Sequence, residues 1–140
     1  MWFSKKETDK TPQGQVTTKA VGDAAEQVAL AHLRAAGLHL METNYRTPGR
    51  GGGEIDLIMR DADGTLVFVE VRHRASQSHG GAGASISAVK QKRIVFAARH
   101  YLMRFKTLPP CRFDVVLIHG RPAADGAQAI EWLRSAFDAF

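Results

Sequence analysis

Two acidic residues and one basic residue interrupt two strongly β-forming stretches of the sequence. Asp56 lies within GEIDLI, and Glu70 and Arg72 lie within VFVEVR. Charged residues are uncommon in strands, and burying one without a partner is costly. Either these side chains face solvent, with Arg46 or Arg72 pairing with the acids, or they converge on a site that requires negative charge.

The turn between the two strands decides whether the acids share a face. A three-residue turn at 62–64, with Gly64 in the left-handed conformation, is a common hairpin solution. Counting back along that ladder places Asp56 directly opposite Glu70. A two- or four-residue turn would shift the register by one and send the acids to opposite faces. The position of Gly64 favours the first arrangement.

A carboxylate pair of this kind could perform metal-dependent chemistry. Like charges directly opposite one another destabilise a sheet, and a divalent cation relieves the repulsion. Oxygen ligands suit Mg²⁺ or Mn²⁺. Arg72, two residues beyond Glu70, would then point toward a phosphate or the charge that develops on it. Hydrolysis of a phosphodiester needs these components together.

The surrounding elements predict one mixed α/β domain. Apolar spacing predicts helices over 19–36 and 87–106, the second with Ser85 or Ser87 as its N-cap. Strands are expected over 38–46, 54–60, 65–74 and 111–119. AIEWLRSAF adds a short C-terminal element that brings Trp132 and Phe137 to the core. The order is therefore α-β-β-β-α-β plus this element, in a domain over 18–140 that follows a flexible basic arm over 1–17.

Composition indicates which partners and which cellular location to expect for the protein. The formal net charge is +5 and the sequence pI is about 9.7, which points toward a polyanionic partner. A single cysteine excludes an internal disulfide framework and fits a reducing compartment. The sequence has no apolar run long enough to span a bilayer and no secretory signal pattern, so we expect a cytoplasmic protein without a membrane partner.

The glycine-rich segment GRGGG at 49–53 invites comparison with phosphate-binding loops. It precedes a strand and lacks the GK[ST] and the following helix of a nucleotide-binding P-loop. We interpret it as a mobile loop beside the acidic site that lets a phosphate backbone approach Gly51 to Gly53.

Together these motifs resemble the YraN family of small bacterial proteins, across roughly residues 18–140. That family is similar to the PD-(D/E)XK nucleases, with a restriction-endonuclease-like α/β/α fold around a central mixed sheet, and in layout to archaeal Holliday-junction resolvases. The motifs that carry the resemblance are Gly22 and Glu26 with Ala29, Leu33 and Gly37, Asn44-Tyr45-Arg46, Gly53 to Ile58, Phe68 to Arg72, Lys90 with Arg93-Ile94 and Ala97, Arg112 to Val115, and Trp132-Leu133 with Ala136-Phe137.

The resemblance assigns roles to individual residues. It implies that Asp56 and Glu70 bind the metal, that Glu26 joins them from the first helix, and that Lys90 supports the site. Arg72 stands where the superfamily usually has lysine, and because arginine stays charged it cannot act as a base. Resolvase-like relatives also imply a homodimer as one arrangement of the chain.

The sequence therefore predicts a Mg²⁺- or Mn²⁺-dependent endonuclease-like protein that binds DNA and hydrolyses its phosphodiesters. Arg46, Lys90, Lys92 and Arg93 are the cations expected to contact the nucleic acid. Two alternatives remain: a non-catalytic nucleic-acid-binding protein on the same fold, and an adaptor that binds a protein through the loop 75–85. For two of these residues a plainer interpretation also stands: Glu26 as an ordinary exposed helix residue, and Lys90 as part of a solvated basic helix face.

Overall fold

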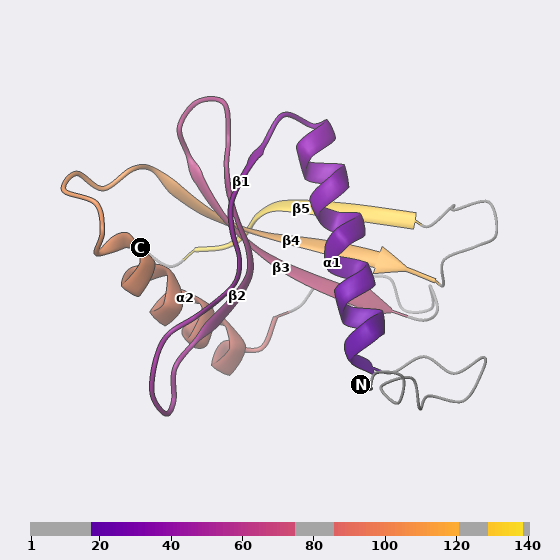
Figure 1. The fold of residues 1–140 in the computed structure, drawn as a ribbon, viewed down its shortest axis with the longest axis horizontal. Helices are drawn as coiled ribbons and strands as arrows, with labels where there is room; N and C mark the ends of the chain where they lie inside the picture. The colour runs from indigo at the N-terminus through magenta and orange to yellow at the C-terminus, as the bar shows by residue number, and fades with distance from the viewer. Residues whose placement is uncertain (1–17, 75–85, 121–128, 139–140) are drawn as a thin grey trace, which may run out of the picture.

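The computed structural model describes residues 18–74, 86–120 and 129–138. They form a sheet of five strands with a helix packed against each face (Figure 1). The elements are α1 (Thr18–Ala35), β1 (His39–Arg46), β2 (Glu54–Arg60), β3 (Leu66–Arg74), α2 (Ala88–Leu102), β4 (Cys111–His119) and β5 (Ala129–Phe137). The predicted order is confirmed, and the C-terminal element is a complete strand.

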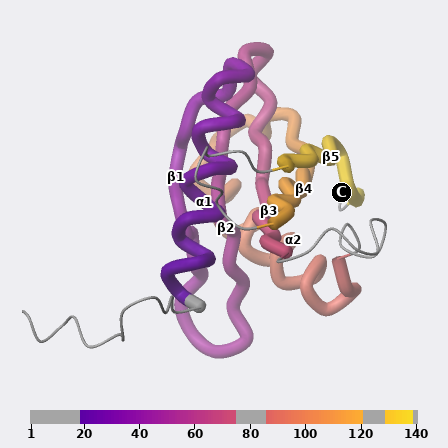
Figure 2. The backbone as a smooth tube through the Cα atoms, turned by 90° about the vertical axis from the view of Figure 1, so that its right-hand side faces the viewer, coloured from indigo at the N-terminus to yellow at the C-terminus, as the bar shows by residue number. Residues whose placement is uncertain are grey.

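The strands lie in sequence order across the sheet, from β1 at one edge to β5 at the other (Figure 2). The pairs β1–β2, β2–β3 and β4–β5 are antiparallel, whereas β3 and β4 are parallel. Parallel neighbours need a long crossover, which α2 supplies. This mixed sheet is consistent with the restriction-endonuclease-like α/β fold that the sequence predicted.

Each face of the sheet has its own hydrophobic core. On one face Ala29 and Leu33 of α1 pack with residues such as Val69 of β3. On the other face Ile94 and Tyr101 of α2 pack with the remaining apolar positions of the same strands. Because both faces are covered, the central strands are apolar almost throughout, as expected for strands buried on two sides. From β5, Trp132 and Phe137 pack against these cores as predicted.

The second helix begins as predicted but ends earlier. The side chain of Ser87 accepts a hydrogen bond from the N–H of Lys90 at 3.1 Å, which makes Ser87 the N-cap. The helix ends at Leu102, because the amides from Met103 to Phe105 bond three residues back instead of four. These tight turns bring Phe105 against the core. No helix in the described ranges is long and apolar enough to cross a membrane.

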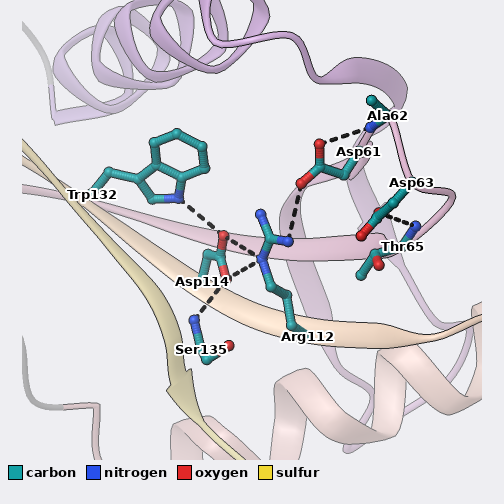
Figure 3. A network of polar contacts seen from close by, with 8 residues as sticks. All are labelled: Asp61, Ala62, Asp63, Thr65, Arg112, Asp114, Trp132 and Ser135. Carbon is teal, nitrogen blue, oxygen red and sulfur yellow. Dashed lines mark hydrogen bonds and ion pairs between the residues drawn. The ribbon is translucent and has the colours of Figure 1, made fainter.

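A buried polar network joins the β2–β3 turn to β4 and β5 (Figure 3). Asp114 is fully buried and accepts hydrogen bonds from Arg112 Nε at 3.1 Å, from Trp132 Nε1 at 2.9 Å and from the N–H of Ser135 at 2.9 Å. The same guanidinium donates from Nη1 to Asp61 at 3.1 Å. The network thus satisfies a buried charge and holds three segments of the sheet in register.

Candidate active site

The β2–β3 turn has the geometry that the sequence predicted. The N–H of Asp61 donates to the carbonyl of Thr65 at 2.9 Å, and the N–H of Gly64 donates to the carbonyl of Asp61 at 2.9 Å. Gly64 has φ +93°, a conformation that side chains rarely adopt. The turn therefore contains three residues, 62–64, and fixes the register of the hairpin.

This register brings the two strand acids together. The ladder between β2 and β3 ends at Leu57 paired with Val69, so Asp56 and Glu70 are the residues that directly adjoin its last pair. The side chain of Asp56 accepts a hydrogen bond from the N–H of Val71 at 2.8 Å, which turns its carboxylate toward β3. The predicted convergence of the two acids is a property of the fold.

The carboxyl groups of Asp56 and Glu70 interact directly. Glu70 is 8% exposed, and burial raises its pKa to about 7, with the neighbouring charge of Asp56 acting in the same direction and Lys90 opposing it. Burial also raises the pKa of Asp56, while the Val71 N–H and the Glu70 carboxyl lower it by hydrogen bonding. Burial therefore favours the protonated form of both groups, and their mutual hydrogen bond raises the pKa of Glu70 while it lowers that of Asp56.

Lys90 forms an ion pair with one acid of this pair. Its Nζ lies 3.5 Å from Glu70 Oε2, and its side chain is 46% exposed. Because Ser87 caps α2 three residues earlier, the start of the helix sets the direction from which Lys90 reaches β3. The interpretation of Lys90 as a wholly solvated helix residue does not fit this contact, whereas a supporting position beside the acids does.

Arg72 lies on the same side of the carboxyl pair as Lys90. It is partly buried, and it lines one surface depression together with Glu70, Ser87 and Lys90. The depression therefore combines one acid of the pair with two cations. A phosphate that entered it would meet both Arg72 and Lys90, as the sequence analysis expected of Arg72.

Glu26 approaches the pair from α1. Burial raises its pKa, and the charge of Asp56 raises it further, so the two carboxylates sense one another. The side chain of Asn44 hydrogen-bonds Glu26. In the part of the chain that the structure describes, no group of three or more Asp, Glu, His or Cys side chains is already arranged around one point. Glu26 is thus close enough to Asp56 to sense its charge.

Asn44 is a residue that the sequence analysis assigned only to a motif. It lies in β1 with φ +50°, the left-handed conformation, which asparagine tolerates better than most residues. The register of β1 and β2 puts it opposite Asp56, between the pairs Thr43–Leu57 and Tyr45–Ile55. An asparagine in the middle of a strand, where this residue type is depleted, was the signal that could have identified it.

The basic residues predicted to contact nucleic acid divide into two groups. Arg46, Lys90 and Arg93 line one pocket with Glu54 and the glycine loop 49–53. Lys92 lies on another side of α2, in a depression that includes Phe96 and Arg99. Only the first group is brought together, and Lys90 connects it to the carboxyl pair.

The donors at the carboxyl pair suit a hard divalent cation. Asp56 and Glu70 supply oxygen atoms from adjacent strands, and because burial raises the pKa of both groups, a bound cation would favour their ionised forms. Two carboxylates with water and substrate oxygens are a sufficient ligand set for Mg²⁺. The residues present therefore fit such an ion.

Comparison with known proteins gives one consistent answer. The model of a family described as "Uncharacterised protein family UPF0102" matches residues 25–118. A UPF0102 protein from Polaromonas naphthalenivorans is 66% identical, over 99% of both chains. UPF0102 proteins from Paracidovorax citrulli and Cupriavidus taiwanensis are 66% and 54% identical, over 89% and 86% of this chain and 87% and 85% of theirs. The matched range includes every candidate site residue from Glu26 to Arg93.

Proposed function

The chain belongs to the UPF0102 family, which is the YraN family, and from this premise we propose that it is a divalent-metal-dependent nuclease that hydrolyses DNA phosphodiesters. One observation carries the proposal. The buried carboxyl group of Glu70 and the half-buried one of Asp56 interact across adjacent strands, next to the cations Lys90 and Arg72. Burying like charges together is unfavourable, and binding of a cation and a phosphate at this site would offset that cost.

In this proposal each residue of the site has its own role. Asp56 and Glu70 would hold the metal, with Glu26 contributing through water. When bound, the ion would supply an activated water molecule and neutralise charge on the phosphoryl group. Arg72 keeps its charge and binds a phosphate oxygen, because a guanidinium does not act as a base. Lys90 balances Glu70 and contacts the same phosphate from α2.

The direct test is cleavage of DNA by purified protein with Mg²⁺ or Mn²⁺, on duplex, flap and four-way-junction substrates. We expect Asp56→Asn and Glu70→Gln each to reduce cleavage at least about 100-fold, because each removes a charged ligand. Asp23→Asn is the matched control, since this exposed acid on α1 forms its ion pair with Lys19 of the same helix, at 2.8 Å. If the Asp56→Asn, Glu70→Gln double variant cuts as fast as the wild type, the assignment is wrong.

A second candidate function rests on Arg72. If the site has lost the lysine that its superfamily usually uses, the protein would bind nucleic acid without hydrolysing it. Titration calorimetry separates the two functions. Binding of DNA together with no heat from millimolar Mg²⁺ would select the binding protein. The third alternative, an adaptor acting through 75–85, concerns residues outside the described ranges, and it predicts no DNA binding at low salt.

The proposal also includes the cellular location and the oligomeric state of the protein. A DNA-directed activity agrees with the expected cytoplasmic location and with the net charge of +5. The homodimer implied by the resolvase-like layout is part of the same proposal, and light scattering at several protein concentrations tests it. A monomer at all concentrations would remove the dimer and leave the site unaffected.

A further inference from the structure

A pocket beside the carboxyl pair is built by the β1–β2 loop and α2. Its lining includes the glycines 49 and 51–53 of the loop and four charged residues, Arg46, Glu54, Lys90 and Arg93. Arg46 and Glu54 form an ion pair at 3.5 Å, so the acid is neutralised and the pocket keeps an excess of positive charge. Because the lining is mainly polar and charged, the pocket suits an anion rather than an apolar ligand.

The loop is held against α2 by contacts that require glycine. The N–H of Gly53 donates to Thr47 Oγ1 at 2.7 Å, and the N–H of Thr47 donates to the carbonyl of Gly53 at 3.1 Å. A Cβ atom on Gly53 would lie 1.9 Å from the carbonyl oxygen of Arg93. The backbone of the loop at Gly53 therefore packs directly on the backbone of α2 at Arg93, and a side chain at this position would not fit.

The tip of the loop presents free backbone donors. Within the described structure the N–H groups of residues 49–51 donate no hydrogen bond, whereas a tight turn at 49–52 points the N–H of Gly52 toward the carbonyl of Gly49. Gly49 has φ +85° and Gly51 has φ +66°, whereas Arg50 between them does not have a positive φ. Alternation of this kind turns successive N–H groups toward the same side, which is the geometry of an anion-binding nest.

We infer that this nest, with Arg46 and Arg93, is a phosphate subsite that binds the nucleic acid backbone next to the carboxyl pair. Lys90 links the two, because it lines this pocket and also pairs with Glu70. A phosphate in the nest therefore lies beside the one that Arg72 and the acids would receive. The inference rests on the proposed function, since it takes the ligand to be a phosphodiester of the same DNA strand.

Two variants that each remove one positive charge test how much the pocket cations contribute to DNA affinity. We measure duplex DNA affinity by fluorescence anisotropy in EDTA, between 50 and 200 mM salt. We expect Arg93→Gln to bind about three- to tenfold more weakly at 50 mM salt and to lower the salt slope by about one, as loss of one phosphate contact does. The control Arg34→Gln removes the same charge from the exposed surface of α1, on the opposite face of the sheet. It should leave both quantities unchanged.

A second measurement tests the nest without a variant. Amide resonances of Gly49, Gly51 and Gly52 are followed by NMR during titration with inorganic phosphate and, separately, with a short duplex. We expect both to shift these amides, with the duplex acting at much lower concentration. Shifts with inorganic phosphate alone would assign the pocket to a small phosphate and overturn the inference. Unmoved amides in both titrations, or Arg93→Gln bound as tightly as the control, would overturn it too.

The two proposals fail separately in these experiments. Absence of cleavage with every metal, alongside amide shifts with DNA and weaker binding of Arg93→Gln, would remove the hydrolytic function and support the subsite. Cleavage that depends on Asp56 but is insensitive to Arg93 at low DNA concentration would retain the nuclease and remove the subsite.

Discussion

The carboxylate of Asp56 accepts a hydrogen bond from the backbone N–H of Val71 at 2.8 Å, across the β2–β3 pair. Val71 directly follows Glu70, so this bond holds the first acid beside the second before any ligand is present. A site that is organised in advance loses less conformational freedom when it binds.

Metal affinity should increase with pH and then level off. The pKa of Glu70 is about 7, and a cation must displace the proton that Glu70 holds below this pH. Binding of Mn²⁺ should therefore be about tenfold weaker at pH 6 than at pH 8, with little further change above that. Titration calorimetry in buffers of different ionisation enthalpy measures both the affinity and the released proton. Equal affinity at the two pH values would mean that the ion binds elsewhere.

Without metal, the same pair should make stability fall as pH rises. The pKa of Glu70 is raised from its ordinary 4.5 to about 7, so between these values the folded protein holds a proton that the unfolded chain has lost. The stabilisation is complete below about pH 4.5 and is lost as pH rises through 7. It amounts to about 3 kcal/mol.

Urea unfolding in EDTA at pH 5.5 and 8 measures this effect. Because other groups also titrate, the quantity to compare is the difference between wild type and Glu70→Gln, which carries no titrating group at this position. We expect the Gln variant to be the relatively more stable protein at pH 8. A difference that does not change with pH would contradict the raised pKa of Glu70.

The Asp114 network should be necessary for stability and not for chemistry. Asp114→Asn removes the charge that faces Arg112 Nε at 3.1 Å and leaves the guanidinium largely buried without it. Breaking a buried ion pair in this way costs about 3–5 kcal/mol. Chemical denaturation should show this loss, with Asp23→Asn as a surface control. At a temperature where the variant is folded, its Mn²⁺ affinity should equal that of the wild type.

Two glycines should respond in opposite ways to alanine. Gly53→Ala brings a Cβ into the backbone of α2 and should destabilise the fold by about 1–3 kcal/mol. Gly22→Ala lies in α1 with no heavy atom within 4 Å of the added Cβ. It should stabilise by about 0.5–1 kcal/mol, because alanine is the better helix former. Thermal unfolding of the two variants measures both, and the same sign for the two would refute the packing of the loop on α2.

The sequence was sufficient where local rules determine geometry. The strand at 54–60 and the strand at 111–119 have the predicted bounds, because their apolar, β-branched composition ends abruptly at polar or glycine residues. Gly64 specified a three-residue turn, and the turn then specified that Asp56 faces Glu70. The acidic pair of the candidate site could thus be found from turn chemistry and strand alternation alone.

Other features depend on tertiary contacts that the sequence does not display. Asn44 adopts the left-handed conformation inside β1, and no local sequence pattern requires it there. The early end of α2 depends on tight turns that bring Phe105 to the core, whereas the two prolines at 109 and 110 suggested a later end. Lys92 shares a basic stretch with Lys90 but lines a different depression, because residues two apart on a helix point in different directions.

Lys90 belongs to two pockets at once, one containing Glu70 and the other containing the glycine loop. A single ammonium group cannot give its full attraction to a carboxylate and to an incoming anion at the same time. Occupancy of either pocket must therefore change the free energy of filling the other, and by thermodynamic reciprocity the change is equal in both directions. The carboxyl pair and the glycine loop would in this way be coupled through one flexible side chain at the start of α2.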